Sequence, residues 1–302
     1  MKKDKNVWKK VKRYRGIYLM LLPVLVYFLV FSYYPLVLGI INSFQKVKIL
    51  GGSEFAGMDN YINVATSSTY QQALGNSLIV GIGTFLLQFV LGLVIALLLN
   101  EVKNKVARSL IQTVTYIPYL LSWAVVGGLW ITIFSPTGMI NGILEMFSSG
   151  DFQPIVFMSE PIFARGIMIF TGAWKGAGYF AALFLATIVS LDSSIYEAAQ
   201  IDGASKLQQF WFITVPHIKI VVGLLVVLRT IWVFNNFDII YLLTGGGPAN
   251  ATTTMPIYAY NMGWNTKLLG RSSAVTMLLL AFLLLVCVVY FTIIAKWEKE
   301  DK

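Results

Sequence analysis

The feature that most constrains this chain is a series of apolar runs long enough to cross a lipid bilayer. A transmembrane helix needs about 20 mostly apolar residues because the hydrocarbon core is about 30 Å thick. Six such runs occupy residues 16–41, 74–99, 110–134, 162–191, 218–243 and 273–295. Only 12% of the 302 residues are charged, about half the share of a soluble domain. The sequence therefore predicts an all-α integral membrane protein with six transmembrane helices.

The first run is expected to remain in the protein as a membrane span. It follows a tail in which residues 1–15 carry eight Lys or Arg, so the two together superficially resemble a secretory signal. The apolar core of such a signal is about 7–15 residues long, whereas residues 16–41 are long enough to cross a bilayer. In the third run, Pro118 is expected to kink the helix.

The distribution of positive charge predicts the orientation of the chain. Cytoplasmic loops of membrane proteins are enriched in Lys and Arg. Of 23 such residues, 16 lie in the two terminal tails, in the connector 100–108, and within or just after residues 192–217, whereas residues 135–160 have none. We therefore expect both termini in the cytoplasm and 135–160 as an external loop. Orientation also accounts for the net charge of +9 without invoking a nucleic acid.

Residues 192–217 are half polar but have the composition of a helix. No proline lies between Tyr196 and Phe212, and Gly203 interrupts a run of good helix formers. We predict two short helices that meet near Gly203 and lie along the membrane surface, with Pro216 as the stop before the next run. Steps of three and four residues predict one apolar face and leave four polar residues for water or a partner. The apolar residues are Ile201, Ala204, Leu207, Phe210 and Trp211, and the polar ones are Glu197, Asp202, Lys206 and Gln209.

A spaced pattern within this segment resembles a known signature. Glu197-Ala198-Ala199 is followed after three residues by Gly203, after nine more by Ile213, and then by Val215-Pro216. The pattern is similar to the EAA loop of the membrane subunits, or permeases, of binding-protein-dependent ABC importers, with Val215 in place of leucine. In that family the loop forms a cytoplasmic coupling helix that docks in a cleft of the ATPase. The resemblance implies that the ATPase-coupling residues are Glu197, Ala198, Ala199, Asp202, Gly203, Ile213 and Pro216, with Gly203 allowing close docking.

Further motifs extend the resemblance over nearly the whole chain. Residues 57–61, 97–100, 116–118, 174–175 and 235–248 are similar to those of maltose- and glycerol-phosphate-type carbohydrate permeases. This implies a type I ABC importer permease architecture in a bacterial plasma membrane. The N-terminal tail, first helix and external segment would occupy residues 1–71. The permease core would occupy 72–295, with the coupling loop at 192–217, and a cytoplasmic tail 296–302.

The same resemblance implies partners for this chain. They are a second, homologous permease in a heterodimer, two copies of an ABC ATPase, and an extracellular or periplasmic sugar-binding protein. Since the sequence has no phosphate-binding loop of the GxxxxGK[ST] type, ATP and Mg²⁺ are expected on the separate ATPase. We predict a transport subunit rather than an enzyme, with no cofactor, no catalytic residue and no metal. A lone Cys287 and a lone His217 offer little for a metal site.

Polar residues in the fourth and fifth runs are candidates for contact with a sugar. Polar groups inside a span usually face a cavity or a partner helix, and amides with an indole suit a sugar's hydroxyls and its apolar face. On a continuous helix, Trp232, Asn235 and Asn236 share one face. Helix-to-helix contact is the alternative for these three, and a structural role is favoured for Asp238 and Arg229. The candidate pathway residues are Trp174, Tyr179, Trp232, Asn235, Asn236 and Asp238, while Lys175 is expected to extend towards the membrane surface.

Other functions are compatible with a membrane protein of this size. An ion-coupled secondary transporter needs a coupling site, usually carboxylates or broken helices at mid-membrane in two related halves. Asp238 is the one acid inside a predicted span, and the sequence shows no internal repeat. A membrane transferase needs clustered acids, which are absent from the predicted membrane faces. The secondary transporter is retained as the alternative, and a plain connector remains the alternative for residues 192–217.

Overall fold

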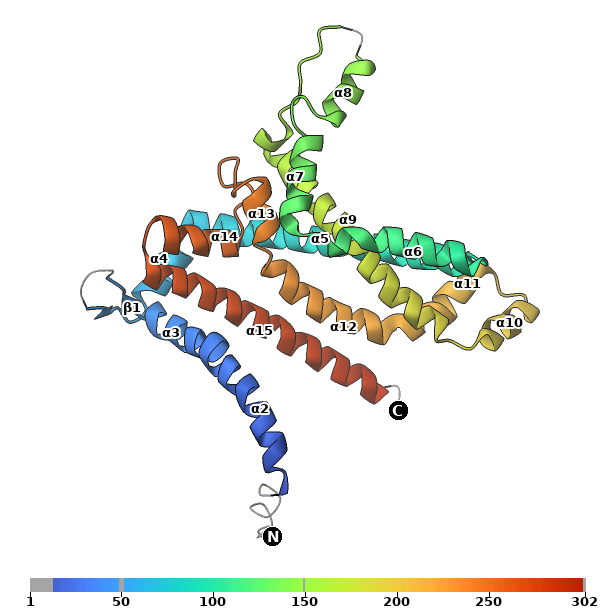
Figure 1. Cartoon of the computed structure of the whole chain (residues 1–302), viewed down its shortest axis with the longest axis horizontal. Coiled ribbons are helices and arrows are strands. Elements are labelled where there is room, and N and C mark those ends of the chain that lie inside the picture. The colour runs from blue at the N-terminus through green and yellow to red at the C-terminus, as the bar shows by residue number, and fades with distance from the viewer. Residues whose placement is uncertain (1–12, 49–51, 149, 301–302) are drawn as a thin grey trace.

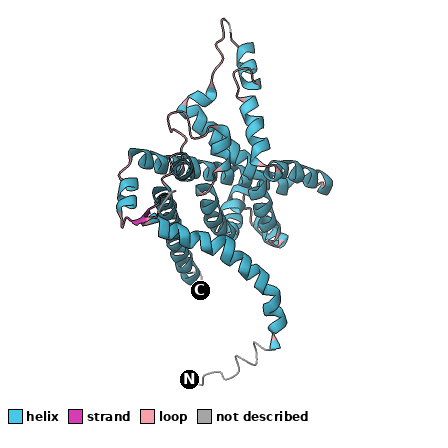
Figure 2. Ribbon diagram, turned by 60° about the vertical axis from the view of Figure 1, so that its left-hand side comes forward, coloured by secondary structure: helices cyan, strands magenta, loops and turns pink. Residues whose placement is uncertain are grey.

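The computed structural model describes residues 13–48, 52–148 and 150–300. Residues 1–12 of the predicted basic tail and residues 301–302 of the predicted cytoplasmic tail lie outside these ranges. The described chain is mostly helical, which confirms the predicted class, apart from one small antiparallel hairpin (Figure 2). The α-helices are α2 (Arg15–Phe28), α3 (Tyr34–Ser43), α4 (Asp59–Ala65), α5 (Ser68–Glu101), α6 (Lys105–Leu120), α7 (Trp123–Ile133), α8 (Met139–Met146), α9 (Pro161–Val189), α10 (Ser193–Ile201), α11 (Lys206–Gln209), α12 (Val215–Phe234), α13 (Asp238–Leu243), α14 (Met255–Tyr260) and α15 (Leu269–Glu300).

Shorter elements connect these helices. Strands β1 (Gln45–Lys46) and β2 (Glu54–Phe55) pair with Gln45 opposite Phe55. The π-helical turns are η1 (Leu29–Tyr33), η3 (Phe210–Thr214) and η4 (Asn261–Asn265), and η2 (Phe157–Ser159) is a 3-10 turn. Residues 135–160, predicted as a loop, contain α8 and η2. There the buried Asn141 amide donates to the carbonyls of Ser135 and Ile155 at 3.0 and 2.9 Å.

The centre of the molecule is built on α5 and α9, which pack along each other, with α6 against α9 (Figure 1). Small residues allow this close approach. A Cβ at Gly92 would overlap Phe180, a Cβ at Gly176 would overlap the Gln88 side chain, and a Cβ at Gly178 would overlap the backbone at Thr115. Close contact between small residues is a common way to hold membrane helices together. Helices α5, α6 and α9 therefore form a tightly packed unit.

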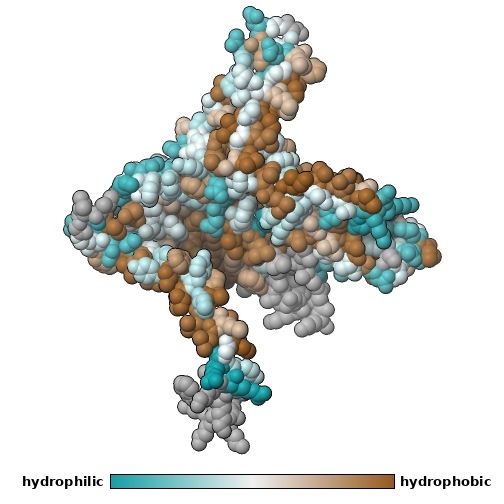
Figure 3. Space-filling model, viewed as in Figure 1, coloured by the Kyte–Doolittle hydropathy of each residue, from teal (hydrophilic) through white to brown (hydrophobic). Residues whose placement is uncertain are grey.

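Four helical stretches in the described chain are long and apolar enough to cross a membrane. They are Arg15–Ser43, Ser68–Glu101, Pro161–Val189 and Leu269–Thr292, and they match the first, second, fourth and sixth predicted runs. The first stretch, made of α2, η1 and α3, has no buried residue in its most apolar window, and much of its visible surface in Figure 3 is apolar. Exposed apolar surface on this scale marks contact with lipid or with another protein.

The third predicted run, residues 110–134, is a broken helix rather than a kinked one. Helices α6 and α7 meet at 96° across Leu121 and Ser122, and as one bent unit they make a fifth candidate span. Pro118 lies in the last turn of α6, and Ser122 begins α7 by accepting a hydrogen bond from the backbone N–H of Val125 at 3.3 Å. A proline that weakens one helix, followed at once by a residue that caps the next, gives a break instead of a bend.

The fifth predicted run, residues 218–243, is also broken. Helix α12 ends at Phe234, residues 235–237 are not helical, and α13 starts at Asp238. The Asn235 side chain donates to the Ile231 carbonyl at 2.8 Å and so competes with the helical backbone. At the other end, Pro216 does not stop the preceding helix as predicted. The chain is helical from α11 through η3 into α12, and Pro216 lies directly after the π-helical turn η3, in the first turn of α12.

Candidate functional site

Residues 192–217, here called the elbow, contain two helical segments that meet near Gly203, as the sequence predicts. The first, α10, is short, whereas the second begins at α11 and continues through η3 into α12. Gly203 lies between α10 and α11 with a φ of +80°. Its N–H donates to the Gln200 carbonyl at 3.0 Å, and the N–H of Ala204 donates to the Ala199 carbonyl at 2.8 Å. These two bonds are those of a Schellman turn, which ends a helix with a left-handed glycine. Ser205 and Gln208 then form a capping box that starts α11.

The geometry shows that Gly203 is needed for the bend between the two helices. A Cβ at this position would meet no atom of this chain within 4 Å. Within the chain, glycine is required by the left-handed backbone, which costs other L-residues about 1–2 kcal/mol. Clearance for a docking partner stays a prediction.

Four of the seven signature residues converge on one surface depression. Ala199, Asp202, Gly203 and Ile213 line a hollow of about 360 Å³, together with Phe212, whose side chain is 79% exposed. Glu197 and Ala198 are exposed on α10, and Pro216 is exposed at the start of α12, so these three lie beside the hollow rather than in its lining. The structure thus gathers residues up to 14 positions apart into one concave, partly apolar surface.

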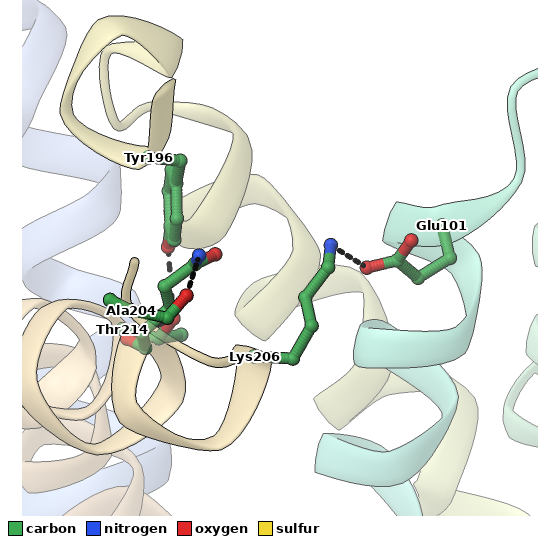
Figure 4. A network of polar contacts seen from close by, with 6 residues as sticks. Glu101, Tyr196, Ala204, Lys206 and Thr214 are labelled. Carbon is green, nitrogen blue, oxygen red and sulfur yellow. Dashed lines mark hydrogen bonds and ion pairs between the residues drawn. The ribbon is translucent and has the colours of Figure 1, made fainter. Parts of the chain in front are cut away.

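The inner side of the elbow is held by polar contacts (Figure 4). The hydroxyls of Tyr196 and Thr214 lie 2.9 Å apart, and the Gln209 amide donates to the Ala204 carbonyl at 2.9 Å. Gln209 is buried, whereas Ile201, Leu207 and Trp211 are exposed. Of the four polar residues predicted to face water or a partner, Glu197, Asp202 and Lys206 are exposed, and Gln209 is the exception. The turn at Gly203 separates α10 from α11, so a single helical periodicity does not run through the segment.

The elbow also contacts the end of α5. Lys206 and Glu101 form an ion pair at 3.1 Å, and both side chains are largely exposed (Figure 4). A cavity of about 790 Å³ lies on this side, lined by the ends of α5 and α9 and by Tyr196 and Lys206 of the elbow. At the start of α10, the backbone N–H of Ser194 donates to the Asp192 carboxylate and holds its pKa below the usual value. The elbow is therefore attached to α5 at its surface and to α12 through continuous helix.

A second candidate region lies where α6 and α12 break; we call it the break region. Helices α7 and α13, which follow the two breaks, pack on each other, with Gly127 against Leu242. Lys175 of α9 contacts the C-terminal end of α6 at the first break. Its ammonium donates to the carbonyls of Pro118, Tyr119 and Leu121 at 3.0, 2.8 and 2.6 Å. Lys175 is buried, so the prediction that it extends to the membrane surface is wrong. The carbonyls freed by the break need a donor in an apolar setting, and Lys175 supplies it.

Aromatic rings surround a second buried cation in the break region. The Arg229 guanidinium lies 4.4 Å from the ring of Tyr179, 5.2 Å from that of Trp232 and 5.7 Å from that of Tyr119. The Tyr119 and Tyr179 rings stack at 4.8 Å, and Trp232 stacks with Trp123 at 6.2 Å. The cluster combines ring faces with positive charge at a point where two helices are interrupted.

The structure brings some of the predicted pathway residues together and separates others. Tyr179 and Trp232 both contact Arg229, as described above. Asn235 is the C-terminal cap of α12 and Asn236 follows it outside any helix, so the predicted helical face does not continue to Asn236. Asp238 is exposed in the first turn of α13, where a negative charge favours the helix. Trp174 packs edge-on against Trp130 of α7 and lies outside the Arg229 cluster.

Sequence reasoning missed Tyr119 and Trp123 as members of this cluster. They flank the break between α6 and α7, and Pro118 was the one local signal that the helix is interrupted there. Their proximity to α9 and α12 follows from packing between segments more than 50 residues apart, which no local pattern carries.

The fold and the elbow define a class: a multi-helix membrane permease whose signature loop forms a separate surface element. A family model described as binding-protein-dependent transport system inner membrane component matches residues 88–298. The chain belongs to this family, the permease subunits of binding-protein-dependent ABC importers. The recognition made from the EAA pattern is thereby confirmed.

The matches to named relatives extend over most of this chain and most of each relative. The polygalacturonan/rhamnogalacturonan transport permease YteP of Bacillus subtilis is 32% identical over 278 residues, 90% of this chain and 85% of its own. The trehalose/maltose transport permease MalF of Thermococcus litoralis is 32% identical and covers 96% of this chain and 98% of its own. A bacterial ABC transporter involved in import of the acidic polysaccharide alginate has a chain with TM-score 0.85 and 29% identity, covering 96% of this chain and 98% of its own. A chain of a bacterial alginate ABC transporter in complex with alginate pentasaccharide-bound periplasmic protein has a TM-score of 0.84 and 29% identity. The match covers 95% of this chain and 96% of that one.

Proposed function

We propose that this chain is the membrane-spanning subunit of an ATP-driven importer that moves a sugar or oligosaccharide into the cytoplasm by alternating access. ATP is hydrolysed on separate ATPase subunits, two copies per complex, and a second homologous permease completes the pore. An external sugar-binding protein delivers the substrate. The supporting relatives carry names of sugar or polysaccharide transport, and one matching structure includes a periplasmic protein.

The observation that carries this proposal is the hollow in the elbow. A docking site for a partner protein needs exposed apolar groups in a concave surface whose backbone is held rigid. Phe212 supplies exposed apolar surface, and the Schellman turn and the capping box fix the backbone around Gly203. Movement of a docked ATPase passes into α12 directly because α11, η3 and α12 are one continuous helix.

The substrate pathway is proposed to pass the break region. Non-helical backbone at membrane depth is tolerated where it is buried in protein or lines a water-filled cavity. Both breaks occur beside the aromatic cluster of Tyr119, Trp123, Tyr179 and Trp232. Ring faces cover the apolar face of a sugar, and the amides of Asn235 and Asn236 suit its hydroxyl groups. With α12 carrying both the elbow at one end and Trp232 near the other, ATPase movement reaches the pathway through one helix.

The test is uptake by the complete transporter reconstituted in liposomes. The chain is co-expressed with the second permease, the ATPase and the binding protein that co-purify with it, and uptake of a labelled oligosaccharide mixture is measured with and without enclosed ATP. Wild type is expected to require ATP. Gly203→Asp, which places a branched, charged side chain in the proposed docking hollow, is expected to lower uptake by about tenfold or more with the complex still in the membrane.

Gly203→Asn is the matched control, because Asn tolerates the left-handed conformation better than other residues and adds no charge. It is expected to retain more uptake than Gly203→Asp. Uptake that continues without ATP and stops when an ionophore collapses the ion gradient would identify the alternative, an ion-coupled secondary transporter.

A further inference from the structure

The break region contains two buried cations, Lys175 and Arg229, which are 6% and 5% exposed. Among the described residues the ion pairs are Lys46 with Asp59, Lys48 with Glu54 and Lys206 with Glu101, so neither buried cation is neutralised by a carboxylate of that part of the chain. A buried charge without a counter-ion is costly, and charges inside membrane spans usually serve a function. The two cations differ in how their donors are used.

Lys175 is fully satisfied. An ammonium group has three N–H donors, and three backbone carbonyls at the end of α6 accept from it. Its positive charge also lies at the C-terminus of α6, where the helix dipole stabilises a cation. Nothing in this arrangement leaves a donor for another molecule, so Lys175 holds the break together.

Arg229 is incompletely satisfied. The rings of Tyr119, Tyr179, Phe180 and Trp232 lie within 6 Å of the guanidinium and stabilise its charge through their faces. Ring faces do not replace acceptors in the plane of the guanidinium, and Nη2 has no hydrogen-bond partner among the described residues. A planar guanidinium matches a carboxylate, which can accept two parallel hydrogen bonds from it.

We infer that Arg229 binds the carboxylate of an anionic saccharide, so that the substrates of this permease include oligosaccharides of sugar acids. This rests on the proposed function and specifies its substrate class. The Tyr179 and Trp232 rings would cover the apolar face of the same sugar unit, while the guanidinium receives its charged group. Nη2 is enclosed in this conformation, and the rings around the guanidinium belong to α6, α9 and α12, so the contact forms in a transport state in which α12 has moved relative to α6 and α9.

The experiment compares two substrates of equal length in the reconstituted complex. The probes are a galacturonate trimer and the neutral trimer obtained by reducing its carboxyl groups. Uptake of each is measured for wild type, Arg229→Gln and Arg229→Lys. Because the binding protein is the same throughout, its own preference cancels when each variant is divided by wild type for the same probe.

Wild type is expected to take up the acid trimer, and Arg229→Gln is expected to reduce acid uptake about tenfold more than neutral uptake, the loss of roughly one charge-assisted contact. Arg229→Lys keeps the positive charge but loses the planar pair of donors. Its uptake of the acid trimer is expected to lie between that of wild type and that of Arg229→Gln. Equal loss of both probes would make Arg229 structural and overturn the inference. Uptake of the neutral trimer alone by wild type would also overturn it, with the importer proposal intact. Wild-type complex that shows no ATP-dependent uptake of any oligosaccharide would instead count against the proposed function.

Discussion

The elbow and the break region show two ways in which this chain builds a functional surface. In the elbow, the contacts that set the shape join residues at most 18 positions apart, such as Tyr196 with Thr214, and most side chains are exposed. In the break region, the central contacts join Lys175 to carbonyls 54 to 57 positions away, and both cations are buried. The first is a local structure on the surface, and the second exists only because α6, α9 and α12 pack together.

This difference predicts unequal sensitivity to mutation. A local turn at the surface can distort while the rest of the fold persists, whereas an unsatisfied polar group in the packed interior affects the whole molecule. The following predictions test that contrast, beginning with the largest effect.

Lys175→Met is expected to destabilise the protein by about 3 kcal/mol or more, because the three carbonyls at the end of α6 lose a charged donor in a buried setting. The measurement is reversible denaturation of the purified transporter. Lys103→Met, an exposed lysine in the connector between α5 and α6, is the control and is expected to change stability by less than about 0.5 kcal/mol. Similar stabilities for the two variants would show that the break does not depend on Lys175.

Gly203→Ala is expected to strain the elbow locally by about 1–2 kcal/mol, because alanine disfavours a φ of +80°. Hydrogen exchange should be faster at the amides of residues 203 and 204, which close the Schellman turn, while exchange within α5 and α9 stays at the wild-type rate. Slowed or unchanged exchange at the turn would contradict the assigned role of the glycine. Faster exchange in α5 and α9 would contradict the local character of the elbow.

Lys206→Gln removes the surface ion pair with Glu101 and is expected to have the smallest effect, since exposed pairs are screened by water and salt. Exchange at the elbow amides should rise by less than about twofold at low salt and match wild type at about 1 M salt, where the Debye length is about 3 Å. A larger change that persists at high salt would mean that the pair positions the elbow against α5.

The sequence-based predictions succeed where the signal is local. The apolar runs locate four helices long and apolar enough to span a membrane, and the run of good helix formers interrupted by Gly203 locates the two helical segments of the elbow. Predictions that extended a helical pattern across an interruption failed. The shared face of Trp232, Asn235 and Asn236 assumes a helix that ends at Phe234, and the single kinked third span assumes a helix that breaks at Leu121 and Ser122.

By itself, the sequence determined that the chain is a helical membrane protein, which segments are apolar, and where a family signature lies, because these depend on composition and on spacing along the chain. The tertiary structure decided that the third and fifth runs break, that Lys175 is buried under one of the breaks, and that Arg229 lies among aromatic rings. These outcomes depend on which carbonyls and rings from distant helices come within a few ångströms of each cation. Helical periodicity predicts which side of a helix a residue occupies. It does not predict which residue of another helix will accept its hydrogen bonds or contact its charge.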